Sequence, residues 1–206
     1  MDWPLFDLRL RCRDVRLRAM REDDLEGLAA VLPADVGHDP RLELFNLGEA
    51  ENERRLFYQG YWRALGTWSP ASWVLHMAVE HGGALVGVQT LEGEDFPHLR
   101  TVDSASWLVP GARGRGVGVA MRIAVLGLAF DRLGAVAAVS SATAGNAASL
   151  GVSRRIGYLD NGVGLVRESG GVAPLQHLRL PVDRWRHGGE VTIRGFEACR
   201  PWFGLD

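Results

Sequence analysis

The chain has 206 residues, of which 47% are hydrophobic and 23% are charged, and its formal net charge at pH 7 is −2. This size and composition predict one α/β domain with a sizeable core, and the balanced charge gives no reason to expect a nucleic-acid partner. No apolar run approaches the roughly 18 residues of a membrane span, so we expect no association with a membrane.

The N-terminal segment and the cysteines indicate where the protein works. The opening residues, MDWPLFDLRLRCRD, contain neither the basic nor the apolar region of a secretory signal. Cys12 and Cys199 lie near opposite ends of the chain, and two reduced thiols are favoured over a disulfide. We therefore predict a cytoplasmic protein.

Hydrophobic periodicity and turn residues predict the elements of the first half of the chain. In chain order they are a strand over 14–20, a helix over 21–33, a loop or broken helix over 34–50, a helix over 51–68, a β-hairpin over 72–92 and a strand over 101–110. A proline ends the last of these strands.

The second half of the chain begins with an almost wholly apolar helix. It starts near Gly118, and Arg122 is its only charge before Asp131, so most of its surface must be covered by protein. The later elements are a buried strand over 135–143, a short helix over 147–157 capped by Asn146, and strands over 162–169 and 174–181. This order predicts an α/β fold with a mixed sheet and helices on both faces.

The end of the chain forms a tail with its own features. Residues 1–188 are predicted to make up the domain, and residues 189–206 contain a small strand and an aromatic cluster. We expect this tail to lie on the same domain or on a second copy in a homo-oligomer.

A loop of alternating glycine and arginine precedes the apolar helix. It reads Gly-Ala-Arg-Gly-Arg-Gly-Val-Gly over residues 111–118. Alternate glycines let successive backbone N–H groups turn to one side, and the following helix adds its unpaired N-terminal N–H groups. With Arg113 and Arg115 at the rim, the loop predicts a phosphate-sized anion site rather than a solvated turn.

Two common phosphate-binding motifs do not fit this loop. A Walker A loop requires Gly-Lys-Ser/Thr, and the sequence contains no lysine. A Rossmann fingerprint requires G-x-G-x-x-G, but its third glycine position holds Val119 when counted from Gly114 and Met121 when counted from Gly116.

Two motifs carry a resemblance to a known family. Arg113-x-x-Gly116-x-Gly118 resembles the coenzyme A pyrophosphate loop of the GNAT superfamily of N-acyltransferases. Asn-Ala-Ala-Ser at 146–149, followed by Arg-Arg-Ile-Gly-Tyr at 154–158, resembles the second signature of that family, especially in the branch of ribosomal-protein N-terminal acetyltransferases. Element order and spacing are similar from about residue 14 to residue 181.

Three further segments resemble an actinobacterial subgroup of the family that includes a mycobacterial succinyltransferase. They are WPLFDLR at 3–9, VDSASWL at 102–108, and the ending with WR at 185–186 and CRPWFG at 199–204.

The resemblance implies the GNAT fold, in which strand 103–109 diverges from strand 135–143 and leaves a V-shaped slot in the sheet. It implies acyl-CoA, either acetyl-CoA or succinyl-CoA, as co-substrate, and no metal. The residues implied to hold the CoA are Trp107, Leu108, Val109, Arg113, Gly114, Arg115, Gly116, Val117, Gly118, Val119, Asn146 and Ser149.

Acyl transfer from a thioester to an amine requires a neutral amine, a polarised carbonyl and a protonated leaving thiolate. Asp103 is the predicted general base, acting directly or through a water held with Ser104 or Ser106, and an exposed strand-edge carboxylate is the open alternative. Glu92, Glu94 and Asp95 are the runners-up for the base, and a solvated acidic turn is the favoured interpretation of these three residues.

The acid step departs from the family pattern. Many members have a tyrosine at the position of Ser153, so Ser149 and Ser153 are the remaining candidates to hydrogen-bond the thiolate or relay a proton. Tyr158 is predicted to lie in the core. A succinyl donor would also need a cation for its free carboxylate, and Arg41, Arg100 and His98 are candidates by position.

The main hypothesis is an N-acyltransferase that moves an acetyl or succinyl group from acyl-CoA to a primary amine. The acceptor is a protein N-terminus, a lysine or a small-molecule amine. The alternatives are a non-catalytic acyl-CoA sensor on the same fold, which Ser153 in place of tyrosine supports, and an interaction domain that docks a partner through the aromatic tail.

Overall fold

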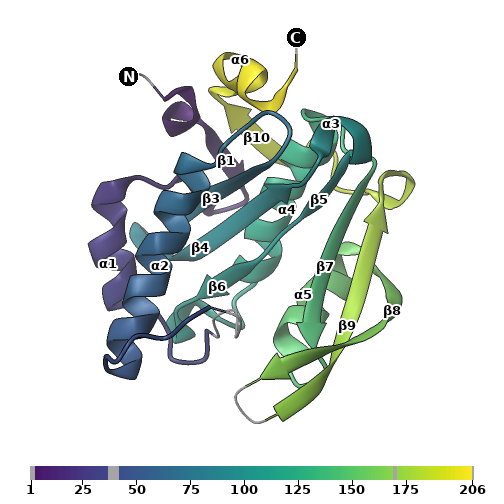
Figure 1. The fold of residues 1–206 in the computed structure, drawn as a ribbon. Helices are drawn as coiled ribbons and strands as arrows, with labels where there is room; N and C mark the ends of the chain where they lie inside the picture. The colour runs from purple at the N-terminus through teal and green to yellow at the C-terminus, as the bar shows by residue number, and fades with distance from the viewer. Residues whose placement is uncertain (1–2, 37–41, 169–170, 206) are drawn as a thin grey trace.

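The computed structural model describes residues 3–36, 42–168 and 171–205. In this part of the chain, ten strands form one mixed sheet with helices on both faces, as the sequence predicts (Figure 1). The strand order is β10-β1-β2-β3-β4-β5-β7-β9-β8, with β6 paired to β4. The strands are β1 Arg9–Cys12, β2 Val15–Ala19, β3 Trp73–His81, β4 Ala84–Gly93, β5 Thr101–Asp103, β6 Ser106–Leu108, β7 Ala137–Thr143, β8 Leu159–Glu168, β9 Gly171–Pro181 and β10 Val191–Arg194.

Helices cover the sheet in two groups. The helices are α1 Leu25–Ala30, α2 Glu49–Gly66, α3 Phe96–Leu99, α4 Val117–Asp131, α5 Ala147–Ile156 and α6 Phe196–Cys199. In Figure 1, α1 and α2 lie in front of the sheet, and α4 and α5 lie behind it. Among the described residues, no helix combines the length and apolarity that crossing a bilayer requires.

The larger core lies between the sheet and α4. Nearly every residue of α4 from Ala120 to Phe130 is buried, which confirms the prediction of a helix covered on most of its surface. Gly127 allows β10 to approach this helix, because a Cβ built there would lie 2.7 Å from Val191 Cγ2. A smaller apolar cluster, including Met20, Tyr61 and Val88, lies under α1 and α2.

The predicted elements are present, but the short helices α3 and α6 were not predicted, and the strands differ in two ways. The sequence analysis missed β1, which pairs with β2 on one side and with the tail strand β10 on the other. The strand predicted over 101–110 is also interrupted, because Ser104 and Ala105 separate β5 from β6. The tail therefore lies against the N-terminal strand of the same chain, and Cys12 and Cys199 are buried free thiols, as predicted.

Candidate functional site

The sheet opens between β5–β6 and β7. β5 pairs in parallel with β7 at two positions only, Thr101 with Ala137 and Val102 with Ala138. Beyond Val102 the chain continues into β6, which pairs with β4 and with no other described strand. Figure 1 shows β6 and β7 moving apart, in agreement with the V-shaped slot that the family resemblance implies. We call this point of divergence the fork.

The Thr90 side chain of β4 is hydrogen-bonded to Ala105, one of the two residues that interrupt the strand next to the fork. Thr90 N donates to Ala105 O at 2.8 Å, and Ala105 N donates to Thr90 Oγ1 at 3.0 Å. The register with β4 is the same on both sides, since Glu92 pairs with Asp103 and Gln89 pairs with Ser106. The interruption therefore bends the strand away from β7 without shifting its register on β4.

The outer edge of β6 has backbone groups that no strand pairs. Ala105 O and Val109 N are bonded to β4, at Thr90 N and Val86 O. Because backbone groups alternate along a strand, those of Ser106 and Leu108 point toward the fork. The Trp107 side chain lies on the α2 face, where its ring is 6.2 Å from that of Phe57. Three residues were predicted to hold the pantetheine arm. Of these, Leu108 directs its backbone groups toward the fork.

The glycine loop lies directly after β6, at the start of α4. Gly114 and Gly116 have φ of 72° and 83°, the left-handed conformation that glycine favours. Gly116 is the N-cap of α4, which begins at Val117, and it supplies no side chain to the first-turn N–H groups. Nothing lies within 4 Å of a Cβ built at Gly114 or Gly116, so the loop has open space above it. These features fit a diphosphate.

Arg113 connects this loop to two other segments. Its Nε donates to Leu108 O at 2.9 Å, and its Nη1 and Nη2 contact the two carboxylate oxygens of Asp35 at 2.5 and 2.8 Å. This contact lowers the pKa of Asp35 and raises that of Arg113. Arg113 was predicted to stand at the rim of an anion site, and its guanidinium is in fact bound to a carboxylate of the loop after α1. Arg115 is exposed.

The helix α5 faces the glycine loop from the other side of the fork. Asn146 caps it, as predicted, and its Oδ1 accepts from Ser149 N at 3.0 Å. Val152 lies 3.4 Å from a Cβ built at Gly118, so α5 and the start of α4 are in contact. Ser149 is half-exposed in the first turn, whereas Ser153 is fully buried, and its Oγ has no hydrogen-bond partner among the described residues.

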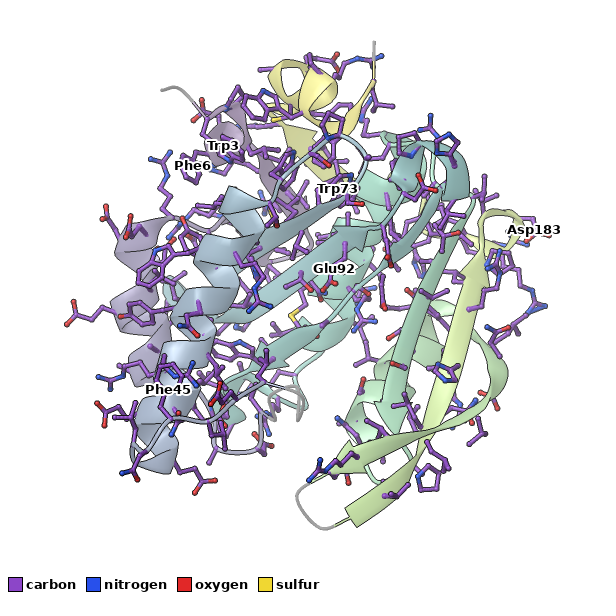
Figure 2. All side chains as sticks on the ribbon, viewed as in Figure 1. Trp3, Phe6, Phe45, Trp73, Glu92 and Asp183 are labelled. Carbon is purple, nitrogen blue, oxygen red and sulfur yellow. The ribbon has the colours of Figure 1, made fainter. Side chains whose placement is uncertain are left out.

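Two carboxylates stand side by side at the fork. Glu92 of β4 and Asp103 of β5 are directly paired across the two strands, and Figure 2 shows Glu92 between α2 and the strands β7 and β9. Burial raises the pKa of both, and the charge of Asp103 raises the pKa of Glu92 further. Asp103 keeps an exposed surface. The interpretation of Glu92 as part of a solvated turn is wrong, although Glu94 and Asp95 do lie in an exposed turn.

The structure adds one polar group that sequence reasoning did not assign to the site. Arg122 of α4 is only 3% exposed, and its Nη1 donates to Ser140 Oγ of β7 at 3.3 Å. Tyr158 and Ser104 are buried next to it. We call Arg122, Ser140, Ser104 and Tyr158 the fork cluster. Its signal in the sequence was a single arginine within an apolar helix.

The cations proposed for a succinyl carboxylate lie elsewhere. Arg100 precedes the paired end of β5, where its Nη1 donates to Leu133 O at 3.3 Å and its guanidinium lies over the Phe96 ring. His98 is exposed and contacts Asp95 at 2.7 Å. Arg41 lies outside the described residues.

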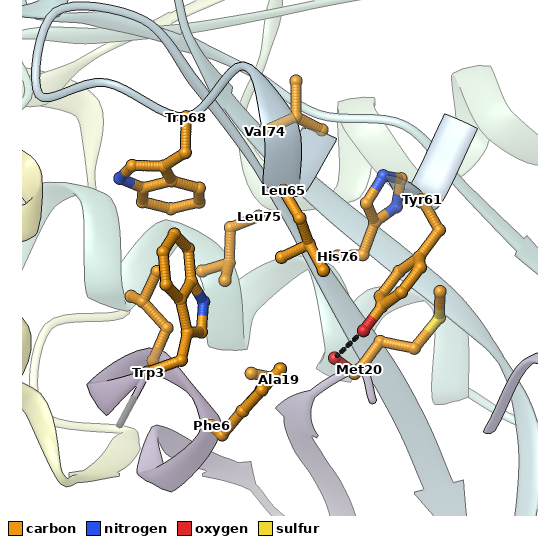
Figure 3. Close-up of a pocket in the computed structure, with 11 residues that line it drawn as sticks. Trp3, Phe6, Ala19, Met20, Tyr61, Leu65, Trp68, Val74, Leu75 and His76 are labelled. Carbon is orange, nitrogen blue, oxygen red and sulfur yellow. Dashed lines mark hydrogen bonds between the residues drawn. The ribbon is translucent and has the colours of Figure 1, made fainter. Parts of the chain in front are cut away.

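A small apolar cavity of about 20 Å³ lies between α2, β3 and the N-terminal segment (Figure 3). Trp3, Trp68 and His76 are among its lining residues, and Tyr61 at its edge donates from its hydroxyl to Met20 O at 3.4 Å. None of the predicted site residues lines it. The cavity therefore belongs to the packing of α2 and carries no part of the site.

Comparisons with known proteins agree with this geometry. A family model described as an acetyltransferase (GNAT) domain matches residues 14–159. A solved structure of a probable acetyltransferase is 20% identical over 85% of this chain and 98% of its own, with a TM-score of 0.65. Mycobacterium smegmatis RimJ in complex with CoA-disulfide is 16% identical over 97% of both chains, with a TM-score of 0.70. The ribosomal-protein-S5-alanine acetyltransferase of Vibrio fischeri is 11% identical over 86% of this chain and 98% of its own, with a TM-score of 0.65. At these identities the solved structures show a common fold.

Proposed function

The chain belongs to the GNAT acetyltransferase family, whose members transfer acyl groups to amines, and from this premise we propose that it moves an acetyl or succinyl group from acyl-CoA to a primary amine. The amine attacks the thioester directly while both substrates are bound. The observation that carries the proposal is the position of the glycine loop. It follows β6 directly, at the strand edge that β7 leaves unpaired.

The donor site consists of the unpaired edge of β6, the loop with the first turn of α4, and the cap of α5. We assign the pantetheine arm to the edge formed by Trp107, Leu108 and Val109, with the backbone of Leu108 facing it, the diphosphate to residues 113–119, and the flank of the arm to Asn146 and Ser149. Acyl-CoA supplies an activated carbonyl and a thiolate leaving group. The backbone N–H groups at the fork provide donors for the carbonyl oxygen as it becomes negative.

Asp103 is the proposed general base. The amine nitrogen forms a bond to the acyl carbon, the carbon–sulfur bond breaks, and the nitrogen loses a proton that Asp103 accepts. The burial that raises the pKa of Asp103 makes it a better base than an ordinary carboxylate. Glu92, paired opposite it, is placed to hold the incoming ammonium ion.

Ser149 and Ser153 are the proposed partners of the leaving thiolate. Ser149 lies in the first turn of α5 and is half-exposed, so it can hydrogen-bond the sulfur or hold a water that protonates it. Ser153 is fully buried, which suits a relay behind Ser149 rather than direct contact.

The acceptor is a protein N-terminus, a lysine or a small-molecule amine. An unperturbed α-amine has a pKa near 8 and a lysine near 10.4, so about a quarter of α-amines but only about a thousandth of lysines are neutral at pH 7.5. A base with a modestly raised pKa suits the α-amine best. The Vibrio fischeri neighbour, described as acting on an alanine of a ribosomal protein, supports a protein N-terminus as the first acceptor to test.

The test is release of free CoA thiol in the presence of acyl-CoA and a panel of amines, followed by mass spectrometry of the acceptor. We expect thiol release that depends on the amine, together with a mass gain of one acyl group. Binding of acyl-CoA without thiol release across peptides, lysine derivatives and polyamines would favour the alternative, an acyl-CoA sensor, which Ser153 in place of the family tyrosine supports.

Two further parts of the proposal concern the setting of the enzyme. The buried free thiols Cys12 and Cys199 support a cytoplasmic location, where thiols stay reduced. β10 of the tail pairs with β1 within one chain, so we propose that any homo-oligomer forms through another surface. Size-exclusion chromatography with light scattering tests the second point.

A further inference from the structure

The fork cluster contains a buried positive charge that forms no direct ion pair with a described residue. Arg122 is 3% exposed, and its hydrogen bond within the described residues goes to a neutral hydroxyl, Ser140 Oγ. Its charge lowers the pKa of Asp103, but no ion pair joins the two side chains. A buried, unpaired guanidinium is strongly unfavourable, so such a residue is usually matched by an anion.

The strand register places this charge at the fork itself. Thr101 and Val102 pair with Ala137 and Ala138, so two residues further on Ser104 and Ser140 face each other where the strands separate. Both side chains are on the face of the sheet that α4 covers, because Val102 and Ala138 face the core on that side. Arg122 of α4 lies beneath the pair and contacts Ser140.

The cluster has polar atoms that no described residue satisfies. Arg122 Nε, Ser104 Oγ and Tyr158 Oη are buried and have no hydrogen-bond partner in the described part of the chain. Burial raises the pKa of Tyr158, although the charge of Arg122 and the nearby Ser104 partly oppose the shift. Tyr158 is therefore a neutral phenol that can donate a hydrogen bond. The cluster thus holds four donor groups, one of them charged, in which Arg122 contacts Ser140 and Tyr158 lies near both Arg122 and Ser104.

We propose that the fork cluster binds the distal carboxylate of a short dicarboxylic acyl group, with succinyl-CoA as the donor. This inference rests on the proposed function, since the acyl chain reaches the fork only if CoA lies along β6. An acetyl group ends in a methyl and would leave Arg122 Nε and the hydroxyls of Ser104 and Tyr158 without an acceptor. A succinyl group extends by two further carbons to a carboxylate, which matches the charge of Arg122 and accepts from Tyr158 and Ser104.

The test compares the binding of CoA, acetyl-CoA and succinyl-CoA by calorimetry to the wild type and to two variants. In Arg122→Met the charge is removed and the volume is nearly kept. We expect wild-type protein to bind succinyl-CoA roughly 10- to 100-fold more tightly than acetyl-CoA, and Arg122→Met to abolish that ratio. Arg115→Met is the matched control, because it removes an exposed cation of the loop and should weaken all three ligands by the same factor.

A second pair of measurements keeps the inference testable if Arg122→Met does not fold. Tyr158→Phe and Ser104→Ala each remove one hydroxyl, and each should reduce the succinyl-to-acetyl ratio about 3- to 10-fold. A thermal shift with free succinate distinguishes a site for any small anion from one that CoA must deliver. We expect no shift with succinate and a clear shift with succinyl-CoA.

The outcomes separate this inference from the proposed function. Equal affinity of wild-type protein for acetyl-CoA and succinyl-CoA, or a ratio that Arg122→Met leaves unchanged, would overturn the role of the cluster and leave the acyltransferase intact. Stabilisation by free succinate alone would also overturn it. Failure to bind CoA in any form would instead contradict the proposed donor site.

Discussion

The hairpin of β3 and β4 and the fork between β5 and β7 belong to the same sheet but are built differently. β3 and β4 are paired at nine positions, whereas β5 and β7 are paired at two. The hairpin buries mainly apolar side chains such as Leu75, Met77 and Leu91, although buried polar atoms of Trp73, His76 and Gln89 also lack a partner among the described residues. The fork buries Arg122, Ser104 and Tyr158, each with a polar atom that no described residue satisfies.

This difference shows which part of the fold contains groups that destabilise it. An unpaired strand edge and a buried charge without an ion pair both destabilise a protein, and the fork combines the two. Here the continuous half of the sheet, together with α4, supports the fork from one side. Substitutions at the fork, including its carboxylate Glu92, should therefore alter ligand binding and catalysis, whereas substitutions in the rest of the hairpin should alter stability alone.

The largest expected effect is on the glycine loop. Gly116→Asp would introduce a carboxylate among the N–H groups at the start of α4, next to the proposed diphosphate. Like charges about 4 Å apart near a protein surface repel by about 4 kcal/mol, so we expect CoA affinity to fall roughly 1,000-fold by calorimetry.

The matched control is Gly116→Ala, which keeps the strain of a left-handed φ of 83° without adding charge. It should lower the free energy of unfolding by about 1 kcal/mol. Equal CoA affinities for the alanine and aspartate variants would show that the added charge has no effect, which would contradict a diphosphate at the start of α4.

The second prediction concerns the paired carboxylates. Asp103→Asn removes the proposed base and should lower kcat by about 100-fold or more with little change in CoA affinity. Glu92→Gln should mainly raise KM for the amine. Because the charge of Asp103 raises the pKa of Glu92, the pKa of Glu92 should fall in Asp103→Asn when followed by NMR. A kcat within a few fold of wild type in Asp103→Asn would remove Asp103 as the base.

The parts of the site that the sequence predicts are those that local chemistry determines. Glycines at 114 and 116 and a buried helix after them are readable from spacing, because left-handed turns and helix starts involve neighbouring residues. Asn146 as a cap is readable for the same reason. The strand order was predictable only through the family resemblance.

The parts that were missed depend on contacts between distant residues. β1 is short and rich in arginine, and it becomes a strand because β10 pairs with it from the far end of the chain. Glu92 looked like a turn residue because its partner Asp103 is brought beside it only by strand pairing. The break at Ser104 and Ala105 depends on the Thr90 side chain, which no local pattern reveals.

The third prediction tests the stable half of the sheet. His76 of β3 is buried against α2, and burial lowers its pKa to about 4. His76 binds a proton near pH 6.5 in the unfolded chain and near pH 4 in the folded chain. The stability contributed by neutral His76 is therefore complete above pH 6.5 and is lost as the pH falls toward 4. The loss amounts to about 3 kcal/mol.

Urea unfolding at pH 7 and pH 4 measures this loss. Between pH 7 and pH 4, the free energy of unfolding should fall by about 3 kcal/mol less in His76→Leu than in wild type. His98→Leu is the control, because His98 is exposed and its substitution leaves the hairpin core unchanged. The same pH dependence in wild type and His76→Leu would show that His76 is not held neutral by burial.

The smallest expected effect is on the contact between Asp35 and Arg113, which joins the loop after α1 to the donor site. Both side chains are largely exposed, so the pair contributes at most about 1 kcal/mol. Asp35 occupies a guanidinium that we assign to the diphosphate, so Asp35→Asn should tighten CoA binding by about 2- to 5-fold at low salt, and the gain should shrink as salt is added. Asp160→Asn is the control, since it breaks an exposed contact with Arg154 outside the loop and should leave CoA affinity unchanged. Weaker binding in Asp35→Asn would mean that the carboxylate positions Arg113 against Leu108 O and does not compete with phosphate, which would make the loop after α1 a part of the donor site.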